Sequence, residues 1–230
     1  INRINNPGRR ILEAKQMVLF QLGAQAFING NMNEAIQHFN SSISLGNQDA
    51  RARNNAYFWR GETYYRMGNY TNAANDFRQF TQNATSSDEN YALGWYNLGY
   101  ALFKQQQYNQ AVNAFQQYVS TEKTRNQPEY ADALNRIGDS YYFNRSFSEA
   151  ERFYAQAADI NPSSADYAAY QRAFVMGLQR NYQGKITALD NLMRNYPNSS
   201  YFDDALYEKS RALTMLNREN EAIAVLQRLV

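Results

Sequence analysis

Aromatic side chains recur along this chain at a spacing that could build a binding surface. Phe20, Phe58 and Tyr96 stand 38 residues apart, Tyr170 and Tyr207 stand 37 apart, and a second row of rings follows seven residues later. Because seven residues are close to two helical turns, both rows share one face of their helices. Rings give a large contact area at little cost in rotamer freedom, and tyrosine adds a polar tip. We therefore expect a partner to bind against Phe20, Phe27, Phe58, Tyr65, Tyr96, Tyr100, Phe103, Tyr142, Tyr170, Phe174 and Tyr207.

The residue types that most often perform catalysis or hold metals are scarce. The chain has no cysteine and one histidine, His38, which leaves a zinc site without its usual ligands. A catalytic base needs an activated nucleophile and an orienting acid, and an array of near-identical units does not suggest such a single constellation around His38. The acidic pairs Asp88 and Glu89, and Asp203 and Asp204, are typical of helix starts. We expect no catalytic residue, no metal and no cofactor.

The overall composition excludes other classes of function. Of the 230 residues 44% are hydrophobic and 19% are charged, and the formal net charge is +2. The basic residues are scattered, whereas a nucleic-acid surface needs a concentrated basic footprint. No apolar run approaches the length of a membrane span. We expect neither nucleic-acid binding nor direct membrane insertion.

A repeated element positions the rings. A small residue is followed twelve residues later by an alanine in five places, and a sixth place keeps the spacing without the alanine. The spacing between copies varies from 35 to 39 residues, so the copies are units of one array. The pairs are Gly23 and Ala35, Gly61 and Ala73, Gly99 and Ala111, Gly138 and Ala150, Ala173 and Lys185, and Ser210 and Ala222.

Each unit is predicted to be a helical hairpin. Apolar residues lie four before and three after the small residue, as in Trp95, Gly99 and Leu102, which is a helical spacing. The same holds around each alanine, and breakers such as Gly30 and Gly68 leave room only for a tight turn between the two helices. Small residues let the two helices approach while a ring fills the groove between them. A hairpin cannot bury both faces alone, so six should stack.

The units resemble the tetratricopeptide repeat. One copy matches the family pattern at Trp95, Leu98, Gly99, Leu102, Tyr108, Ala111 and Phe115, and the next adds the terminal proline at Pro162. The resemblance implies an all-α fold, a right-handed α-α superhelical solenoid of about six hairpins. It also implies a concave face lined by the first helices of the hairpins. We expect a single array over 1–230, with units at about 16–49, 54–87, 92–125, 131–164, 166–199 and 203–230.

Several residues depart from the family pattern. Arg60, Arg172 and Lys209 occupy a position that is usually apolar, and Glu219 replaces the ring that opens the second helix. Lys185 replaces the second alanine, which leaves the packing of the fifth unit open. Family members that clamp a carboxylate use a basic cluster, whereas this chain places rings at one of those positions. A carboxylate clamp is therefore disfavoured.

The two ends of the sequence prompt further expectations. The first helix should run from about Pro7 to Ile28, since proline suits a first helical turn. At the other end Ile223, Leu226 and Leu229 have no polar covering helix, so we expect a segment of a longer array and possible self-association through uncapped ends. Residues 196–207 are similar to repeats of bacterial cell-envelope scaffolds, such as the outer-membrane assembly lipoprotein and the Tol-associated periplasmic protein. That similarity favours a periplasmic or outer-membrane location, with a cytoplasmic one as the alternative.

Three functions remain open at this point. The leading hypothesis is a non-catalytic scaffold that binds a peptide or a helix in its aromatic groove. The second is a structural spacer or oligomerisation arm of a larger multi-repeat protein. The third is a carbohydrate-binding module whose tyrosines stack on sugar rings. The competing interpretation of the rings is that they only pack between neighbouring units.

Overall fold

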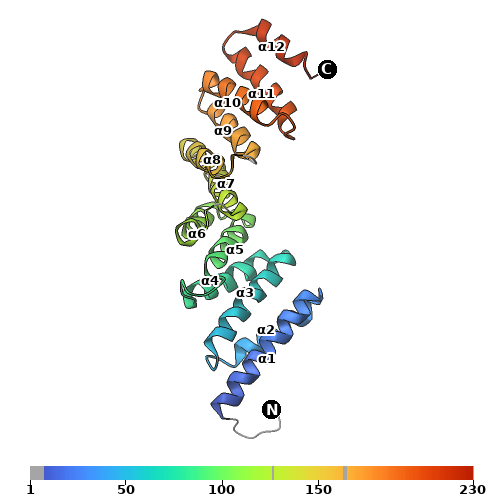
Figure 1. Cartoon of the computed structure of the whole chain (residues 1–230), viewed down its shortest axis with the longest axis vertical. Helices are drawn as coiled ribbons and strands as arrows, with labels where there is room; N and C mark the ends of the chain where they lie inside the picture. Colours follow the sequence, from blue (N-terminus) through green and yellow to red (C-terminus); the bar gives the residue numbers. More distant parts are fainter. Residues whose placement is uncertain (1–7, 126, 163–164, 230) are drawn as a thin grey trace. The chain divides into compact units, whose positions relative to one another are not determined.

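The structure is a computed structural model that describes residues 8–125, 127–162 and 165–229 (Figure 1). This part of the chain contains twelve helices and no strand, as the all-α prediction requires. The helices are α1 (Arg9–Ile28), α2 (Met32–Ser44), α3 (Ala50–Arg66), α4 (Tyr70–Asn83), α5 (Tyr91–Lys104), α6 (Tyr108–Thr121), α7 (Pro128–Phe143), α8 (Phe147–Ile160), α9 (Asp166–Leu178), α10 (Tyr182–Asn195), α11 (Phe202–Met215) and α12 (Glu219–Leu226).

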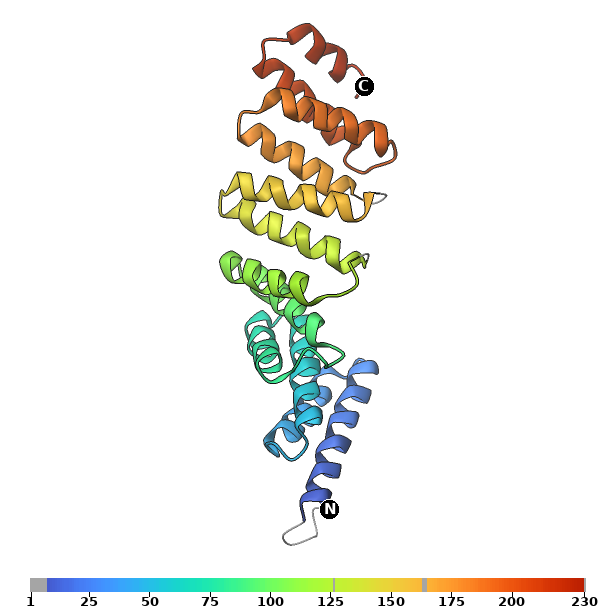
Figure 2. The ribbon, with the colours of Figure 1, turned by 60° about the vertical axis from the view of Figure 1, so that its left-hand side comes forward.

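The helices pair in sequence into hairpins and form two compact units. Unit 1 reaches to Thr121 and holds α1 to α6, and unit 2 begins at Glu122 and holds α7 to α12. Within each unit, every helix packs on the one before it and the one after it. Figure 2 shows this for unit 2, where α7 to α12 lie one upon another in chain order.

A residue in the left-handed backbone region closes the turn inside every hairpin. It always stands seven residues after the small residue of the first helix. In the first two hairpins it is glycine, which adopts this conformation without strain. The later hairpins use residues with side chains there, so the turn geometry is the same although glycine is absent. The six residues are Gly30, Gly68, Gln106, Arg145, Arg180 and Asn217.

In the first four hairpins the glycine of the first helix touches a ring from the second helix, as the sequence predicts. A methyl group added at Gly99 would lie 2.7 Å from the Phe115 ring, and one added at Gly138 would lie 2.7 Å from the Tyr154 ring. Such distances are shorter than any normal carbon–carbon contact, so these glycines are required for the helices to approach. Phe115 and Tyr154 are themselves fully buried. In these four hairpins the helix crossing is therefore part of the buried core.

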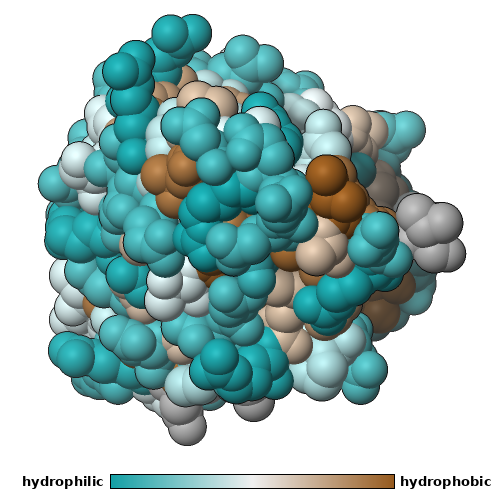
Figure 3. All heavy atoms as spheres, turned by 90° about the horizontal axis from the view of Figure 1, so that it is seen from above, coloured by the Kyte–Doolittle hydropathy of each residue, from teal (hydrophilic) through white to brown (hydrophobic). Residues whose placement is uncertain are grey.

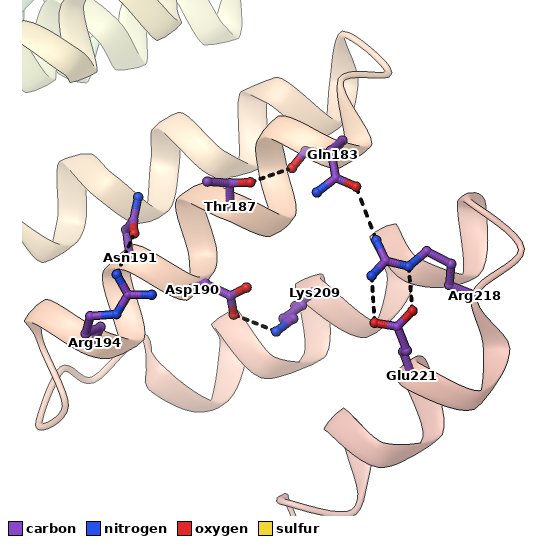
Figure 4. Close-up of polar contacts among 8 residues, drawn as sticks. All are labelled: Gln183, Thr187, Asp190, Asn191, Arg194, Lys209, Arg218 and Glu221. Carbon is purple, nitrogen blue, oxygen red and sulfur yellow. Dashed lines mark hydrogen bonds and ion pairs between the residues drawn. The ribbon is translucent and has the colours of Figure 1, made fainter.

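Three of the charged departures from the repeat pattern, Arg60, Lys185 and Lys209, contact partners of opposite charge. Arg60 donates from Nε and Nη2 to both carboxylate oxygens of Asp76, at 2.7 and 2.6 Å. Lys209 of α11 contacts Asp190 of α10 at 2.5 Å, and Figure 4 shows the two side chains pointing toward one another. The sequence did not decide how Lys185 packs. In the structure Lys185 is buried and forms an ion pair with buried Glu208. Paired charges thus replace apolar contacts in the second, fifth and sixth hairpins.

The ends of the described chain expose apolar side chains. On α12, Ile223 is 55% exposed and Leu226 is 39% exposed, and Leu229, which follows the helix, is 37% exposed. Figure 3 views the molecule from above, from the end where α12 lies, and shows brown apolar surface among teal polar residues. Helix α1 begins at Arg9, and the expected start at Pro7 lies outside the described residues.

The acidic pairs behave differently from one another. Asp203 and Asp204 lie in the first turn of α11, as expected. Asp88 does not start a helix, because its carboxylate accepts the Thr85 N–H at 2.6 Å in the loop before α5. The expectation for this pair is therefore wrong: local loop hydrogen bonding uses the carboxylate instead.

Candidate functional site

Two of the expected binding rings lie in the core instead of on an open face. Phe27 is 6% exposed and Phe58 is 5% exposed. Both pack against Trp59, whose ring centroid lies 5.2 Å from that of Phe27 and 5.6 Å from that of Phe58. Phe58 also contacts Phe77 and Phe80. The expectation that these two rings are exposed in a groove is wrong, because Trp59 packs on Phe27, and Trp59, Phe77 and Phe80 pack on Phe58.

The other expected rings keep part of their surface open. Tyr207 is 53% exposed. The rest are half-buried and also contact rings of their own hairpin or the next one, so packing and exposure are combined in the same side chains. These half-buried rings are Phe20, Tyr65, Tyr96, Tyr100, Phe103, Tyr142, Tyr170 and Phe174.

Three of the expected tyrosines line one cavity in unit 1. The cavity measures about 240 Å³ and lies between α3 and α5, the first helices of the second and third hairpins. Tyr65 and Glu62 are three residues apart and face it from α3, and Tyr96 and Tyr100 are four residues apart and face it from α5. The amide of Asn97 completes the lining. We call this cavity the tyrosine pocket.

The walls of the tyrosine pocket are held by the core. The Tyr96 ring contacts Tyr100 and Tyr118 at 5.0 Å between centroids, and Phe115 at 5.9 Å. Tyr65 rests on Tyr70 at 5.2 Å. Since Tyr118 and Phe115 are fully buried, the wall from α5 is anchored before any partner arrives. A pocket organised in advance loses less conformational entropy on binding.

The charge at the tyrosine pocket comes from Glu62. One of its oxygens, Oε1, accepts a hydrogen bond from the Nε of Arg66 at 2.9 Å. The Arg66 side chain is 53% exposed and the Glu62 side chain 21% exposed, so the guanidinium lies in solvent while the carboxylate is half-covered. Arg66 also stacks over the Phe27 ring at 4.4 Å, which draws it toward the first hairpin.

A second, larger cavity lies in unit 2 between α9, α10 and α11. It measures about 390 Å³, and apolar side chains such as Phe174 and Met215 line it. Charged groups gather at one side, where the buried carboxylate of Glu208 pairs with Lys185 and with the Nη1 of Arg211, the latter at 2.8 Å. We call this cavity the ion-pair pocket.

Electrostatics in unit 2 shift several pKa values. Burial alone would raise the pKa of Glu208, but the hydrogen bond and the charge of Lys185 hold it below its usual range. Burial and the nearby carboxylates of Asp204 and Glu208 raise the pKa of Tyr170 to about 12. Glu208 is therefore ionised and Tyr170 neutral at neutral pH.

The two pockets occupy equivalent places in the repeat. Tyr65 and Gly177 stand four residues after the small residues Gly61 and Ala173. Each pocket is then closed by residues at matching positions of the next first helix, Tyr100 and Arg211. Gly177 carries no side chain where the other site has a tyrosine, and this explains part of the larger volume.

Sequence reasoning missed the polar members of both pockets. Glu62 and Asn97 in unit 1, and Glu208 and Arg211 in unit 2, were not among the expected site residues. For three of them the signal was present, because Glu62, Asn97 and Arg211 each lie one turn from an expected ring on the same helix face, whereas Glu208 directly follows Tyr207. Only the contact between neighbouring first helices shows that they complete a cavity.

Comparisons with known proteins agree with this architecture. Models of the tetratricopeptide repeat match residues 96–165 and 167–199. The chain is built from tetratricopeptide repeats. A model described as anaphase-promoting complex, cyclosome, subunit 3 matches residues 28–118 of these repeats. A search of curated proteins finds no match.

Solved structures similar to this repeat chain include other tetratricopeptide-repeat proteins. MamA is 18% identical with a TM-score of 0.68, over 79% of this chain and 91% of MamA. YrrB, described as a TPR protein with an unusual peptide-binding site, is 14% identical with a TM-score of 0.64, over 83% and 90%. PilF of Pseudomonas aeruginosa is 16% identical with a TM-score of 0.60, over 97% and 92%. The chain therefore has the fold of a protein-interaction scaffold, and the envelope-specific resemblance is not confirmed.

None of the helices placed by the structure combines the length and the apolar character that a bilayer span needs. Within the described residues, no group of three or more histidine, aspartate or glutamate side chains is arranged to hold a metal ion.

Proposed function

We propose that this tetratricopeptide-repeat chain is a non-catalytic scaffold that holds a peptide segment of a partner protein along its first helices. The observation that carries the proposal is the tyrosine pocket, in which three of the expected rings meet between α3 and α5. Its size supports a side chain as the occupant, since pockets for whole drug-sized ligands measure about 300–1,000 Å³. Rigid tyrosines with polar tips are effective anchors for such a segment.

The repeat itself supports binding at more than one point. The ion-pair pocket lies at the equivalent place in unit 2 and offers apolar walls with a charged side. YrrB, which shares the fold, is described as having a peptide-binding site. Each pocket offers an anchor for one side chain of an extended segment.

A peptide-display selection on the immobilised full chain tests this function. Selected peptides are labelled, and their affinity is measured by fluorescence polarisation. We expect Tyr65→Ala to weaken binding by about tenfold, the loss typical of an anchor worth more than 1 kcal/mol. Tyr64→Ala is the matched control, because Tyr64 is the neighbouring residue on α3 but lies beside Arg60, outside the pocket. Equal affinity of both variants and the parent would contradict the proposal.

A second function, head-to-tail assembly of copies, is favoured by the exposed ends. Positions of the first helix that pack on the preceding hairpin are buried inside the array, as at Ala56 and Leu98. Their counterparts in α1, Val18 and Leu22, are 48% and 45% exposed. The exposed face of α12 belongs to a second helix, and inside the array such faces are covered by first-helix residues like Ala56 and Leu98. The α1 face of a second copy of this chain therefore fits the α12 face.

Sedimentation velocity over a range of protein concentrations tests the assembly. If copies stack, the sedimentation coefficient rises with concentration, and Ile223→Lys on α12 abolishes the rise. Asn220→Lys adds the same charge at an exposed polar position of α12 and should leave the rise intact. A single species at all concentrations rules out the assembly.

We also propose a cell-envelope location for the chain. This proposal rests on the similarity of residues 196–207 to envelope repeats. Fractionation of the source cells into cytoplasm, periplasm and membranes tests it directly. Recovery of the full-length protein in the cytoplasmic fraction would contradict an envelope role while leaving peptide binding untouched.

A further inference from the structure

We infer that the tyrosine pocket receives a positively charged side chain, a lysine or an arginine, from the bound segment. This inference rests on the proposed function and specifies the chemistry of one anchor. Five residues line the pocket, and they carry one carboxylate and no positive charge. Its three aromatic rings and its single acid are complementary to a cation and to no anion.

The rings supply the first half of the recognition. The face of an aromatic ring is electron-rich, so a cation within about 6 Å of the centroid is attracted to it. Tyr65 faces the pocket from α3 while Tyr96 and Tyr100 face it from α5, so an entering group meets rings from two sides. The edge-on contact between Tyr96 and Tyr100, 69° between planes at 5.0 Å, turns their ring planes in different directions.

The carboxylate of Glu62 supplies the second half. Its Oε1 accepts from Arg66, and its Oε2 makes no hydrogen bond within the part of the chain that the structure describes. The open oxygen belongs to a residue that lines the pocket, so a bound ammonium or guanidinium can donate to it while lying against the rings. Half-covered by protein, this carboxylate is screened less by solvent than a fully exposed one.

The repeat shows that rings of these rows accept cations. Phe27 is the counterpart of Tyr65 in the first hairpin, and the guanidinium of Arg66 lies 4.4 Å from its centroid. Phe174 is the counterpart of Tyr100 in the fifth hairpin, and the Nζ of Lys185 lies 5.6 Å from its centroid. At both places the chain itself provides the cation, whereas the residues that line the tyrosine pocket include no basic side chain.

The ion-pair pocket is the internal contrast. It stands at the equivalent place in unit 2, but its acid, Glu208, is already paired with Lys185 and Arg211. Two positive charges against one negative charge disfavour a further cation. At equivalent positions of the repeat, the tyrosine pocket thus suits a basic side chain and the ion-pair pocket disfavours one.

A titration with small cations tests the inference without knowledge of the partner. The probe is n-butylammonium chloride, which carries the end of a lysine side chain, and n-butanol at matched salt is its neutral counterpart. Amide resonances of the full-length chain are followed by nuclear magnetic resonance. We expect concentration-dependent shifts at Glu62, Tyr65 and Tyr96 to Tyr100 with the ammonium and none with the alcohol. Amides around Glu208 and Arg211 should stay in place.

Two variants of opposite effect sharpen the test. Glu62→Gln keeps the shape of the side chain and removes its charge. It should lower the affinity for the ammonium about threefold to tenfold. Arg66→Gln frees Oε1 of Glu62 and should strengthen the binding of the ammonium by up to about threefold. A purely structural role of this ion pair would move both variants in the same direction. Glu13→Gln is the matched control, because Glu13 pairs with Arg9 four residues away at 2.8 Å and lines no ring pocket.

The outcomes separate this inference from the proposed function. Equal shifts with n-butanol, or an unchanged affinity in Glu62→Gln, would overturn the inference even if displayed peptides bind. Specific ammonium binding with no peptide captured would uphold the pocket's chemistry and count against the scaffold function. Circular dichroism of each variant verifies that it is folded, which the exposed position of Arg66 and the half-exposed position of Glu62 favour.

Discussion

Glycine at the helix crossings decides how closely two helices of a hairpin approach. At Gly99 the gap to the Phe115 ring cannot hold even a methyl group, since the contact would be 2.7 Å. We expect Gly99→Ala to lower the free energy of unfolding by about 1–3 kcal/mol through overpacking. Gly8→Ala is the control, because nothing lies within 4 Å of its added methyl group. Equal urea midpoints for the two variants would contradict this account of the crossing.

The buried pair of Lys185 and Glu208 gives a second prediction at the residue scale. Both side chains are 7% exposed, so removal of one charge leaves the other buried without its partner. We expect Glu208→Gln to cost about 3 kcal/mol, and the double variant Lys185→Met with Glu208→Gln to cost clearly less. Chemical denaturation of the single and double variants measures the difference. A larger loss in the double variant would show that the pair is a net source of stability.

Tyr170 links stability to alkaline pH. Its pKa is about 12 in the folded chain, against an ordinary value of 10.0, because burial and the charges of Asp204 and Glu208 disfavour the tyrosinate. The unfolded chain therefore loses this proton first. The stabilisation is complete below pH 10 and is lost as the pH rises toward 12. We expect Tyr170→Phe to show a shallower fall of the denaturation midpoint over this range, and an unchanged slope would contradict the assignment.

At the scale of elements, the turn inside each hairpin depends on one left-handed residue. Gln106 holds φ at 59° although its side chain disfavours that region, whereas Gly68 holds 76° freely at the same register. We expect Gln106→Gly to raise the free energy of unfolding by about 0.5–1 kcal/mol, and Gly68→Ala to lower it by about 1 kcal/mol. Thermal denaturation of both variants decides the matter. Destabilisation by Gln106→Gly would mean that the side chain contributes more than the backbone strain costs.

For the whole molecule, the division into two compact units has a consequence for folding. Unit 1 ends at Thr121 and unit 2 begins at Glu122, and each has its own buried core. Because repeat arrays derive their stability from neighbouring contacts, a fragment of three hairpins retains most of its own. We expect fragments 1–121 and 122–230 to be helical and to unfold cooperatively when expressed separately. A fragment without a sigmoidal denaturation curve would show that its hairpins need the other unit.

Much of the fold could be predicted from the sequence because it is local. The pairing of helices follows from the twelve-residue spacing within each unit, and the contact of Gly99 with a ring follows from the size of glycine. The turn residue, seven positions after the small one, is set within the same stretch of chain. Contacts at the helix crossing inside a hairpin join residues fewer than twenty positions apart, and they can be predicted because the residues that make them recur at the same spacing in each repeat.

The candidate site was predictable only in part. A row of rings on one helical face is visible in the sequence, but Phe27 is buried where Trp59 of the next hairpin packs on it, and Phe58 is buried against Phe77 and Phe80 of its own hairpin. Tyr65 meets Tyr96 and Tyr100 at a cavity only because two first helices approach one another, bringing Glu62 with them. Helical periodicity therefore determined which face the rings share. Side-chain packing between hairpins, which depends on the volume of residues about 35 positions apart, decided which rings are covered and where a pocket is left.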